Sequence, residues 1–203
     1  LARDPASGRR WAAFENHNTI ARLAPPAPRA IIRPEAMRRW NANSGPETML
    51  RLADGRFLVI AEGSEGHDDA TRPALLFPGD PVTGAAPVRF RFHAGLRDDP
   101  VDATELPDGR VLILLRRVGL ALPPRFDTSI AIADPAEISP GEVWRPKAVR
   151  HLALGPLADN YEAMAYVPAA PGTREGAIWL MADDNFSVFQ RSLVLRFEWP
   201  GEP

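Results

Sequence analysis

The sequence contains no cysteine, and this absence excludes several classes of site at once. None of its 203 residues can form a disulfide, a zinc–thiolate centre or a cysteine nucleophile. Long apolar runs are also missing, since no segment approaches the roughly 20 apolar residues that span a bilayer. The net charge of −2 lacks the basic excess of a nucleic-acid or anionic-membrane binder. We therefore expect neither nucleic acid nor a membrane as a partner.

The composition that remains is that of a folded protein. Hydrophobic residues make up 45% and charged residues 25%, which is enough apolar content for a core. The 22 prolines and 15 glycines weigh against long helices. The length suits one domain, so residues 1–203 are treated as a single domain.

Short apolar runs joined by Asp-Gly turns recur along the chain. Residues 48–52 lead through a turn at Ala53–Arg56 into residues 57–61, and residues 103–106 lead through Pro107–Arg110 into residues 111–115. Such a turn between apolar runs is a strong hairpin signal, because glycine readily adopts the positive φ that the turn needs. Looser copies of the hairpin are residues 1–14 and 163–181.

Further strand-like runs between the hairpins complete a repeat of about four strands. Units of four strands and roughly 50 residues predict a β-propeller of four-stranded antiparallel blades. The alternative is an antiparallel sandwich, which also has closely spaced short strands. The chain begins in mid-strand and ends after the third strand of its last unit. We therefore expect about four blades of a larger ring, of about six blades for example, with the missing N-terminal part of the same chain as a partner. The additional runs are residues 19–23, 30–33, 74–77, 88–92, 129–133, 148–154 and 193–197.

Polar residues recur at one end of the expected hairpins. The start of the first strand and the end of the second meet at one edge, so these residues should surround one mouth of the central channel. Clustered carboxylates bind Ca²⁺ or Mg²⁺, and they raise one another's pKa, as general acids require. The alternative is a set of solvated loop ends. The residues at the first strands are Glu47, Asp102 and Glu162, and those after the second strands are Glu15, Glu62, Arg116, Arg117, Asp183, Asp184 and Asn185.

Several segments together resemble one known family. The longest is Ala182-Asp183-Asp184-Asn185-Phe186-Ser187, followed by Gln190-Arg191-Ser192-Leu193. These segments resemble the phytase-like domain of bacterial proteins known as the "esterase-like activity of phytase family". The resemblance implies a propeller, a periplasmic or secreted location, and hydrolysis of phosphoesters or esters. An export signal would lie outside the chain or have been removed, because the first residues lack its pattern. The other matching segments are Trp11–Glu15, Ser44–Glu47, Leu75–Pro81, Leu106–Arg110 and Asp159–Glu162.

Two functions remain open. The first is hydrolysis of a small phosphate or carboxylate ester at the acidic mouth by a metal-activated water, with Ca²⁺ as the expected ion, because no Ser-His-Asp arrangement is visible. The second is a non-catalytic propeller that binds a ligand or acts as a scaffold. For the hydrolase the expected catalytic residues are Glu47, Asp102, Glu162 and Arg116, the expected metal ligands are Glu47, Asp102, Glu162 and Asp183, and the expected substrate-binding residues are Glu15, Glu62, Arg117, Asp184, Asn185 and Arg191.

Overall fold

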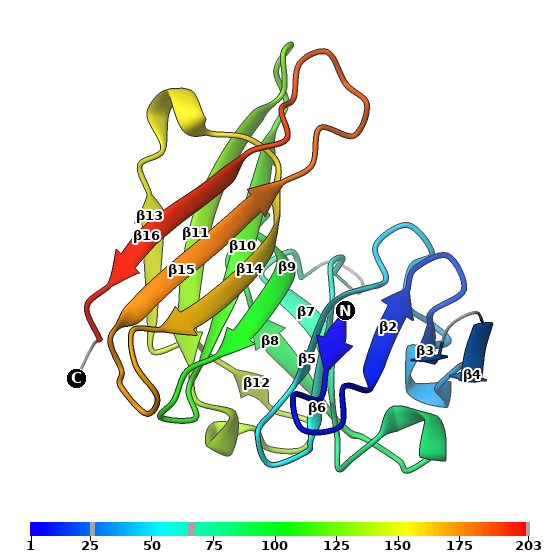
Figure 1. Cartoon of the computed structure of the whole chain (residues 1–203). Helices are drawn as coiled ribbons and strands as arrows, with labels where there is room; N and C mark the ends of the chain where they lie inside the picture. The colour runs from blue at the N-terminus through cyan, green and yellow to red at the C-terminus, as the bar shows by residue number, and fades with distance from the viewer. Residues whose placement is uncertain (25–26, 65–67, 202–203) are drawn as a thin grey trace. The chain divides into compact units, whose positions relative to one another are not determined.

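A computed structural model of the chain describes residues 1–24, 27–64 and 68–201, and its strands form four β-sheets (Figure 1). The predicted fold class is confirmed, because the chain is all-β and its four sheets are the blades of a β-propeller. The chain divides into two compact units, one made of Leu1–Leu96 and Ala136–Arg145, the other of Arg97–Pro135 and Pro146–Pro203. Each unit contributes two blades.

The first unit contains blades 1 and 2. Blade 1 has the strand order β1-β2-β3-β4, and blade 2 has the order β12-β8-β7-β6-β5. The unit also contains a 3₁₀ turn, η1 (Glu35–Met37). The strands are β1 (Ala2–Arg3), β2 (Arg10–Phe14), β3 (Thr19–Ala24), β4 (Ala27–Ile32), β5 (Pro46–Arg51), β6 (Phe57–Ala61), β7 (Thr71–Phe77), β8 (Val88–His93) and β12 (Val143–Trp144), and a second 3₁₀ turn is η2 (Pro81–Thr83).

The second unit contains blades 3 and 4. Blade 3 has the order β13-β11-β10-β9, and blade 4 has the order β14-β15-β16. Within these sheets all pairs are antiparallel, and each blade begins with one of the four predicted hairpins. The strands are β9 (Asp99–Glu105), β10 (Val111–Gly119), β11 (Arg125–Ala133), β13 (Ala148–Leu152), β14 (Tyr161–Pro168), β15 (Gly176–Ala182) and β16 (Val194–Trp199), with the 3₁₀ turn η4 (Gly155–Leu157) before β14; the 3₁₀ turn η3 (Pro135–Glu137) follows β11 and straddles the division between the units.

The two Asp-Gly hairpins share one turn geometry. Gly55 has a φ of 92° and Gly109 a φ of 84°, so both turns use a conformation that disfavours other residues. In each turn the aspartate accepts a hydrogen bond from the backbone N–H of the arginine two residues later, at 2.9 Å for Arg56 and 3.1 Å for Arg110. The same arginines return a side-chain bond to that carboxylate. This local network explains why the Asp-Gly-Arg sequence fixes the turn.

One aspartate, Asp80, binds a core residue of the first unit, Trp11. The Trp11 ring packs edge-on against Phe57, with ring centroids 4.9 Å apart. Asp80 accepts a 2.8 Å hydrogen bond from Trp11 Nε1 and a 2.8 Å ion pair from Arg22, and it caps η2 through the N–H of Val82. Asp80 therefore joins blade 1 to the segment that follows β7 of blade 2. This contact gives a physical reason for the family-like segment Leu75–Pro81.

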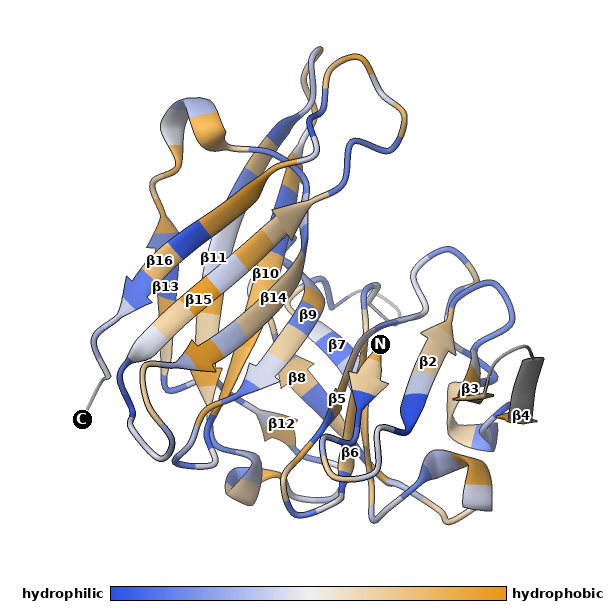
Figure 2. Cartoon of the chain, in the orientation of Figure 1, coloured by the Kyte–Doolittle hydropathy of each residue, from blue (hydrophilic) through white to orange (hydrophobic). Residues whose placement is uncertain are grey.

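In the second unit, blades 3 and 4 bury one face of each sheet against the other. Leu112 and Ile130 of blade 3 and Ile178 and Leu180 of blade 4 belong to this core. Strand β16 contains both hydrophilic and hydrophobic residues, as its colouring shows (Figure 2). Successive residues of a strand face opposite sides, so exposed and less exposed residues alternate along it. Burial of this shared face stabilises the unit at roughly 25 cal/mol for each Å² of apolar surface removed from water.

Candidate functional site

The first hairpins of blades 2, 3 and 4 each carry a β-bulge at the same point. Pairing skips one residue between Pro46 and Thr48, between Pro100 and Asp102, and between Tyr161 and Ala163. Bulges bend a strand and redirect a side chain, and they are common beside active sites. The skipped residues are Glu47, Val101 and Glu162.

This register corrects the expectation that Asp102 is the equivalent of Glu47 and Glu162. Val101 occupies the equivalent position in blade 3, so Asp102 is one residue farther along the strand. Its carboxylate accepts backbone N–H bonds from Ala103 at 2.9 Å and from Met164 at 2.8 Å. Burial raises the pKa of Asp102, and these two amide bonds oppose the rise. Asp102 thus joins strands β9 and β14 within the second unit.

Glu162 is held by a buried polar cluster. Arg116 Nη1 donates to Glu162 Oε1 at 2.7 Å and to Asn160 Oδ1 at 2.8 Å, and Asn160 Nδ2 donates to the same Glu162 oxygen at 2.7 Å. Asn160 is 1% exposed and the Arg116 side chain 11%, whereas the Glu162 side chain is 35% exposed. The arginine and the amide therefore fix one carboxylate oxygen from the protein side. Both of these bonds to Glu162 end on Oε1 and not on the other oxygen, Oε2.

A cavity of about 410 Å³ lies against this carboxylate. Glu162, Asp183 and Ser192 supply its polar lining, and Met181 and Val194 are among its apolar lining. Asn160 ties the two acidic residues together, because its carbonyl accepts a 3.1 Å bond from the Asp183 N–H and its Nδ2 donates to the Asp183 carbonyl at 3.4 Å. The cavity can therefore bind a molecule with one polar end and one apolar part.

The family model described as phytase-like, esterase-like activity of phytase, matches residues 1–186 of the chain. The chain belongs to the phytase-like family. Comparisons with curated proteins and with solved structures gave no match. Within the described residues of this phytase-like chain, no helix is long and apolar enough to cross a membrane.

Several predicted substrate-binding residues of the phytase-like chain are engaged within the protein. Arg117 forms two 2.9 Å bonds with Asp98. Arg191 Nε donates to Asp159 at 3.0 Å, and its Nη2 donates to the Pro156 carbonyl. These bonds show structural duties for both arginines, and their role in substrate binding stays a prediction.

The loop after β15 holds two more of the predicted residues. Asp184 accepts bonds from the Phe186 N–H at 3.0 Å and from Ser192 Oγ at 3.0 Å. Asn185 donates through Nδ2 to Gln190 at 3.1 Å. Asn185 and Phe186 both have positive φ, 46° and 53°, which is unusual for residues other than glycine. The loop is thus shaped by its own side chains, and Asp183 at its start and Ser192 near its end both line the cavity.

In the first unit the predicted glutamates gather around Gly45. The Glu62 N–H donates to the Gly45 carbonyl at 2.9 Å. A Cβ on Gly45 would lie 3.1 Å from the Glu15 Cα and 2.4 Å from Asn18 Oδ1, so only glycine permits this approach. Glu47 follows two residues later at its bulge. These contacts bring the backbone at Glu15 and Glu62 close to Gly45, and the position of all three glutamates at a channel mouth stays a prediction.

The structure does not bring the four predicted metal ligands together as one cluster among the residues it describes. Among the residues that the structure describes, no group of three or more His, Asp or Glu side chains could hold a metal ion. Glu47 belongs to the first unit, and the other three belong to the second. Within the second unit, Glu162 and Asp183 line one cavity. Sequence reasoning missed Asn160, although the residue stands in a family-like segment, because its role depends on contacts with Arg116 and Asp183.

Proposed function

We propose that this phytase-like protein hydrolyses esters in the cavity lined by Glu162 and Asp183. The arrangement of Glu162 supports this proposal most strongly. Its carboxylate projects from a bulge, and one oxygen is fixed by Arg116 and Asn160. The second oxygen remains for a ligand, and a carboxylate held in this way needs little reorganisation during a reaction.

The chemistry assigned to Glu162 is activation of water. Oε2 would accept a proton from a water molecule as the water oxygen attacks the carbonyl carbon or phosphorus of the ester. The bond from that atom to the leaving oxygen then breaks, and the leaving oxygen takes up a proton. General base catalysis of this kind contributes roughly 100-fold to 10,000-fold.

The proposal also includes a Ca²⁺ ion that assists hydrolysis. Glu162 and Asp183 offer only oxygen donors, which is the donor type that Ca²⁺ binds. A bound ion would supply Lewis-acid activation of the ester. Two carboxylates leave most of its about six to eight coordination positions to water and substrate. A periplasmic or secreted location is likewise proposed, from the family resemblance alone.

The test compares Glu162→Gln with Glu175→Gln in the full chain. Glu175 is an exposed residue beside the opposite end of the same hairpin and serves as the matched control. With 4-nitrophenyl acetate and 4-nitrophenyl phosphate as substrates, we expect Glu162→Gln to lower kcat/KM about 100-fold for the ester that is hydrolysed. Glu175→Gln should retain the activity of the unchanged protein.

A melting experiment separates calcium binding from catalysis. A ligand that binds only the folded state stabilises it by RT ln(1 + [L]/Kd), so Ca²⁺ should raise Tm, and Glu162→Gln should reduce the rise. Full activity in Glu162→Gln contradicts the role of Glu162 as the base. If the unchanged protein hydrolyses neither ester, the non-catalytic alternative is favoured. If Ca²⁺ does not change the Tm of the unchanged protein, calcium binding is contradicted.

A further inference from the structure

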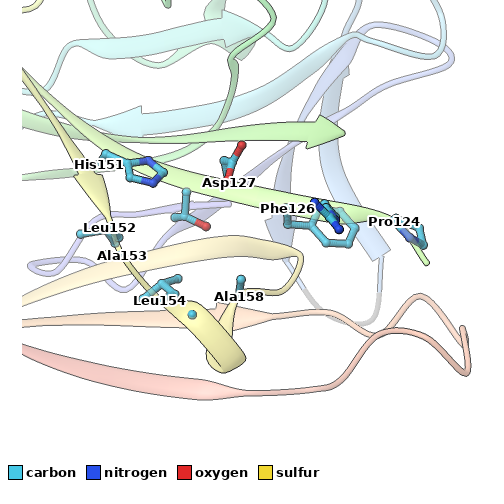
Figure 3. A pocket seen from close by; sticks show the side chains of 11 residues that line it. Pro124, Phe126, Asp127, His151, Leu152, Ala153, Leu154 and Ala158 are labelled. Carbon is cyan, nitrogen blue, oxygen red and sulfur yellow. The ribbon is translucent and has the colours of Figure 1, made fainter. Parts of the chain in front are cut away.

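A second cavity of the second unit lies where strand β13 separates from strand β11. Its volume is about 400 Å³, and Figure 3 shows Phe126 on β11 and Leu154 and Ala158 on the segment after β13 among its lining residues. None of these residues lines the cavity of Glu162. The size is within the range of small-molecule sites, which is roughly 300–1,000 Å³.

Thr128 is the polar group in this cavity that the protein leaves unsatisfied. The residue lines the cavity and is 2% exposed, yet its Oγ1 has no hydrogen-bond partner among the described residues. A buried hydroxyl without a partner costs about 1–3 kcal/mol. A ligand hydroxyl would remove this cost, because a threonine Oγ can both donate and accept.

The backbone of β11 is also open at this place. Strand β13 pairs with residues 128–132 of β11 only, whereas β10 pairs with β11 as far as Arg125. Residues 125–127 therefore have a neighbouring strand on one side alone. Their outward N–H and C=O groups are further partners for a ligand with several hydroxyl groups.

The remaining lining specifies an uncharged ligand. Arg125 and Asp127 are exposed and of opposite charge, and His151 is exposed on β13. A ligand with net charge would be attracted by one of the first two and repelled by the other. Phe126 and Leu154 add apolar surface for C–H groups. The combination suits a ring that carries hydroxyl groups on its edge and hydrogens on its faces.

The wall opposite β11 is held in place by the protein. Tyr161 Oη donates to the Leu157 carbonyl at 2.8 Å, and Arg191 Nη2 donates to the Pro156 carbonyl at 2.8 Å. The turn η4 adds the bond from the Ala158 N–H to the Gly155 carbonyl at 3.1 Å. Because the segment is anchored, the cavity is formed before a ligand arrives, which lowers the entropy cost of binding.

We propose that this cavity binds a small neutral polyol of monosaccharide size, with Thr128 Oγ1 as its buried hydrogen-bond partner. The site is separate from the proposed hydrolytic cavity and does not depend on hydrolysis. It adds a carbohydrate-type ligand to a protein whose family membership concerns esters.

The test uses Thr128→Val and the matched control Thr48→Val. Thr48 is also fully buried with an unpartnered Oγ1, but it lies in the first unit and outside this cavity. Valine has the shape of threonine without the hydroxyl, so both variants should melt at or above the temperature of the unchanged protein. Binding of glucose, galactose, mannose, arabinose and xylose is measured by saturation-transfer NMR on the full chain.

We expect at least one of these sugars to bind the unchanged protein and Thr48→Val equally. Thr128→Val should weaken that binding about fivefold to tenfold, which corresponds to the loss of one hydrogen bond. No saturation transfer to any of the five sugars overturns the proposal. Equal affinity in Thr128→Val and Thr48→Val overturns it as well, because the buried hydroxyl would then have no part in binding.

Discussion

Asp102 shows how one partly buried side chain can serve structure, while the catalytic role suggested by its sequence context stays a prediction. Its two oxygens accept backbone N–H bonds from its own strand and from β14, so the carboxylate replaces part of a backbone ladder between two blades. Thr104 repeats the device, since its Oγ1 accepts a 3.3 Å bond from the Tyr166 N–H. Side chains two residues apart on β9 thereby satisfy the edge of β14.

The pH dependence of stability tests this role of Asp102. Burial raises its pKa in the folded protein, so the folded state binds more protons than the unfolded state around that pKa. The contribution of this group is therefore fully present below its unfolded pKa, near 3.8, and is lost as the pH rises through the folded value.

We expect Asp102→Asn to be less stable than the unchanged protein, because its amide offers one acceptor oxygen in place of two. The difference in Tm should widen from pH 7 towards pH 4, since only the unchanged protein has the titrating group. Thermal melts of both proteins across this range measure it. A difference that is constant with pH, or that narrows on acidification, contradicts the assignment.

At the scale of the element, the Asp-Gly turns join the two strands of the repeated hairpins. Gly109 has a φ of 84°, and a Cβ added there would meet no atom within 4 Å. Any cost of Gly109→Ala therefore comes from the backbone conformation alone. The left-handed region costs an L-residue roughly 1–2 kcal/mol, so Tm should fall by several degrees.

Gly79→Ala is the matched control for this prediction. Gly79 also has open space around its Cα, but its φ lies outside the left-handed region. Replacing a glycine that has an ordinary φ restricts the unfolded chain and leaves stability equal or slightly higher. Differential scanning calorimetry of both variants gives the comparison. Equal melting temperatures for Gly109→Ala and the unchanged protein would show that the turn does not need a glycine.

The elements that sequence predicted well are those with local signals. The hairpins at Asp-Gly turns and the alternating run of β8 follow from short-range chemistry, and the structure confirms both. Strand β12 was missed, because two residues pair in parallel with β8 from a distant part of the chain. The position of Asp102 was misjudged for a related reason: a bulge displaces the register by one residue, and no residue type in Pro100-Val101-Asp102 marks it.

The candidate site was predictable as a set of residue types and not as an arrangement. Polar residues at one end of the hairpins could be found from strand boundaries, and Glu162 and Asp183 do line one cavity. The sequence could not show that Arg191 is held by Asp159, or that Asn160 joins Arg116 to Glu162. Such pairings depend on tertiary contacts between segments far apart in the chain, which one sequence alone does not encode in any local pattern.

At the scale of the whole molecule, blade 4 has two unlike faces. Met164, Ile178 and Leu180 are buried against blade 3. The register places Trp179 and Met181 on the opposite face of the sheet, and they are 40% and 55% exposed. Val167 and Val194 share this outer face and are 49% and 60% exposed. The register also places Arg196 on this face, and its guanidinium carbon lies 5.9 Å from the centroid of the Trp179 ring. Several exposed apolar side chains gathered on one face are nevertheless uncommon on soluble monomers.

We expect this outer face to make the isolated chain self-associate as its concentration rises. Val167→Thr and Trp179→Thr together keep residues that favour strands while removing apolar surface. The double variant should stay monomeric at concentrations where the unchanged protein associates, with a small change in Tm, because both side chains are already exposed. Ile178→Thr, on the buried face of the same strand, should instead lower Tm strongly, because it places an unpaired hydroxyl in the core. Sedimentation velocity over a range of concentrations separates these outcomes. A chain that remains a monomer throughout, with and without the two substitutions, would mean that this face is tolerated in water and does not drive association.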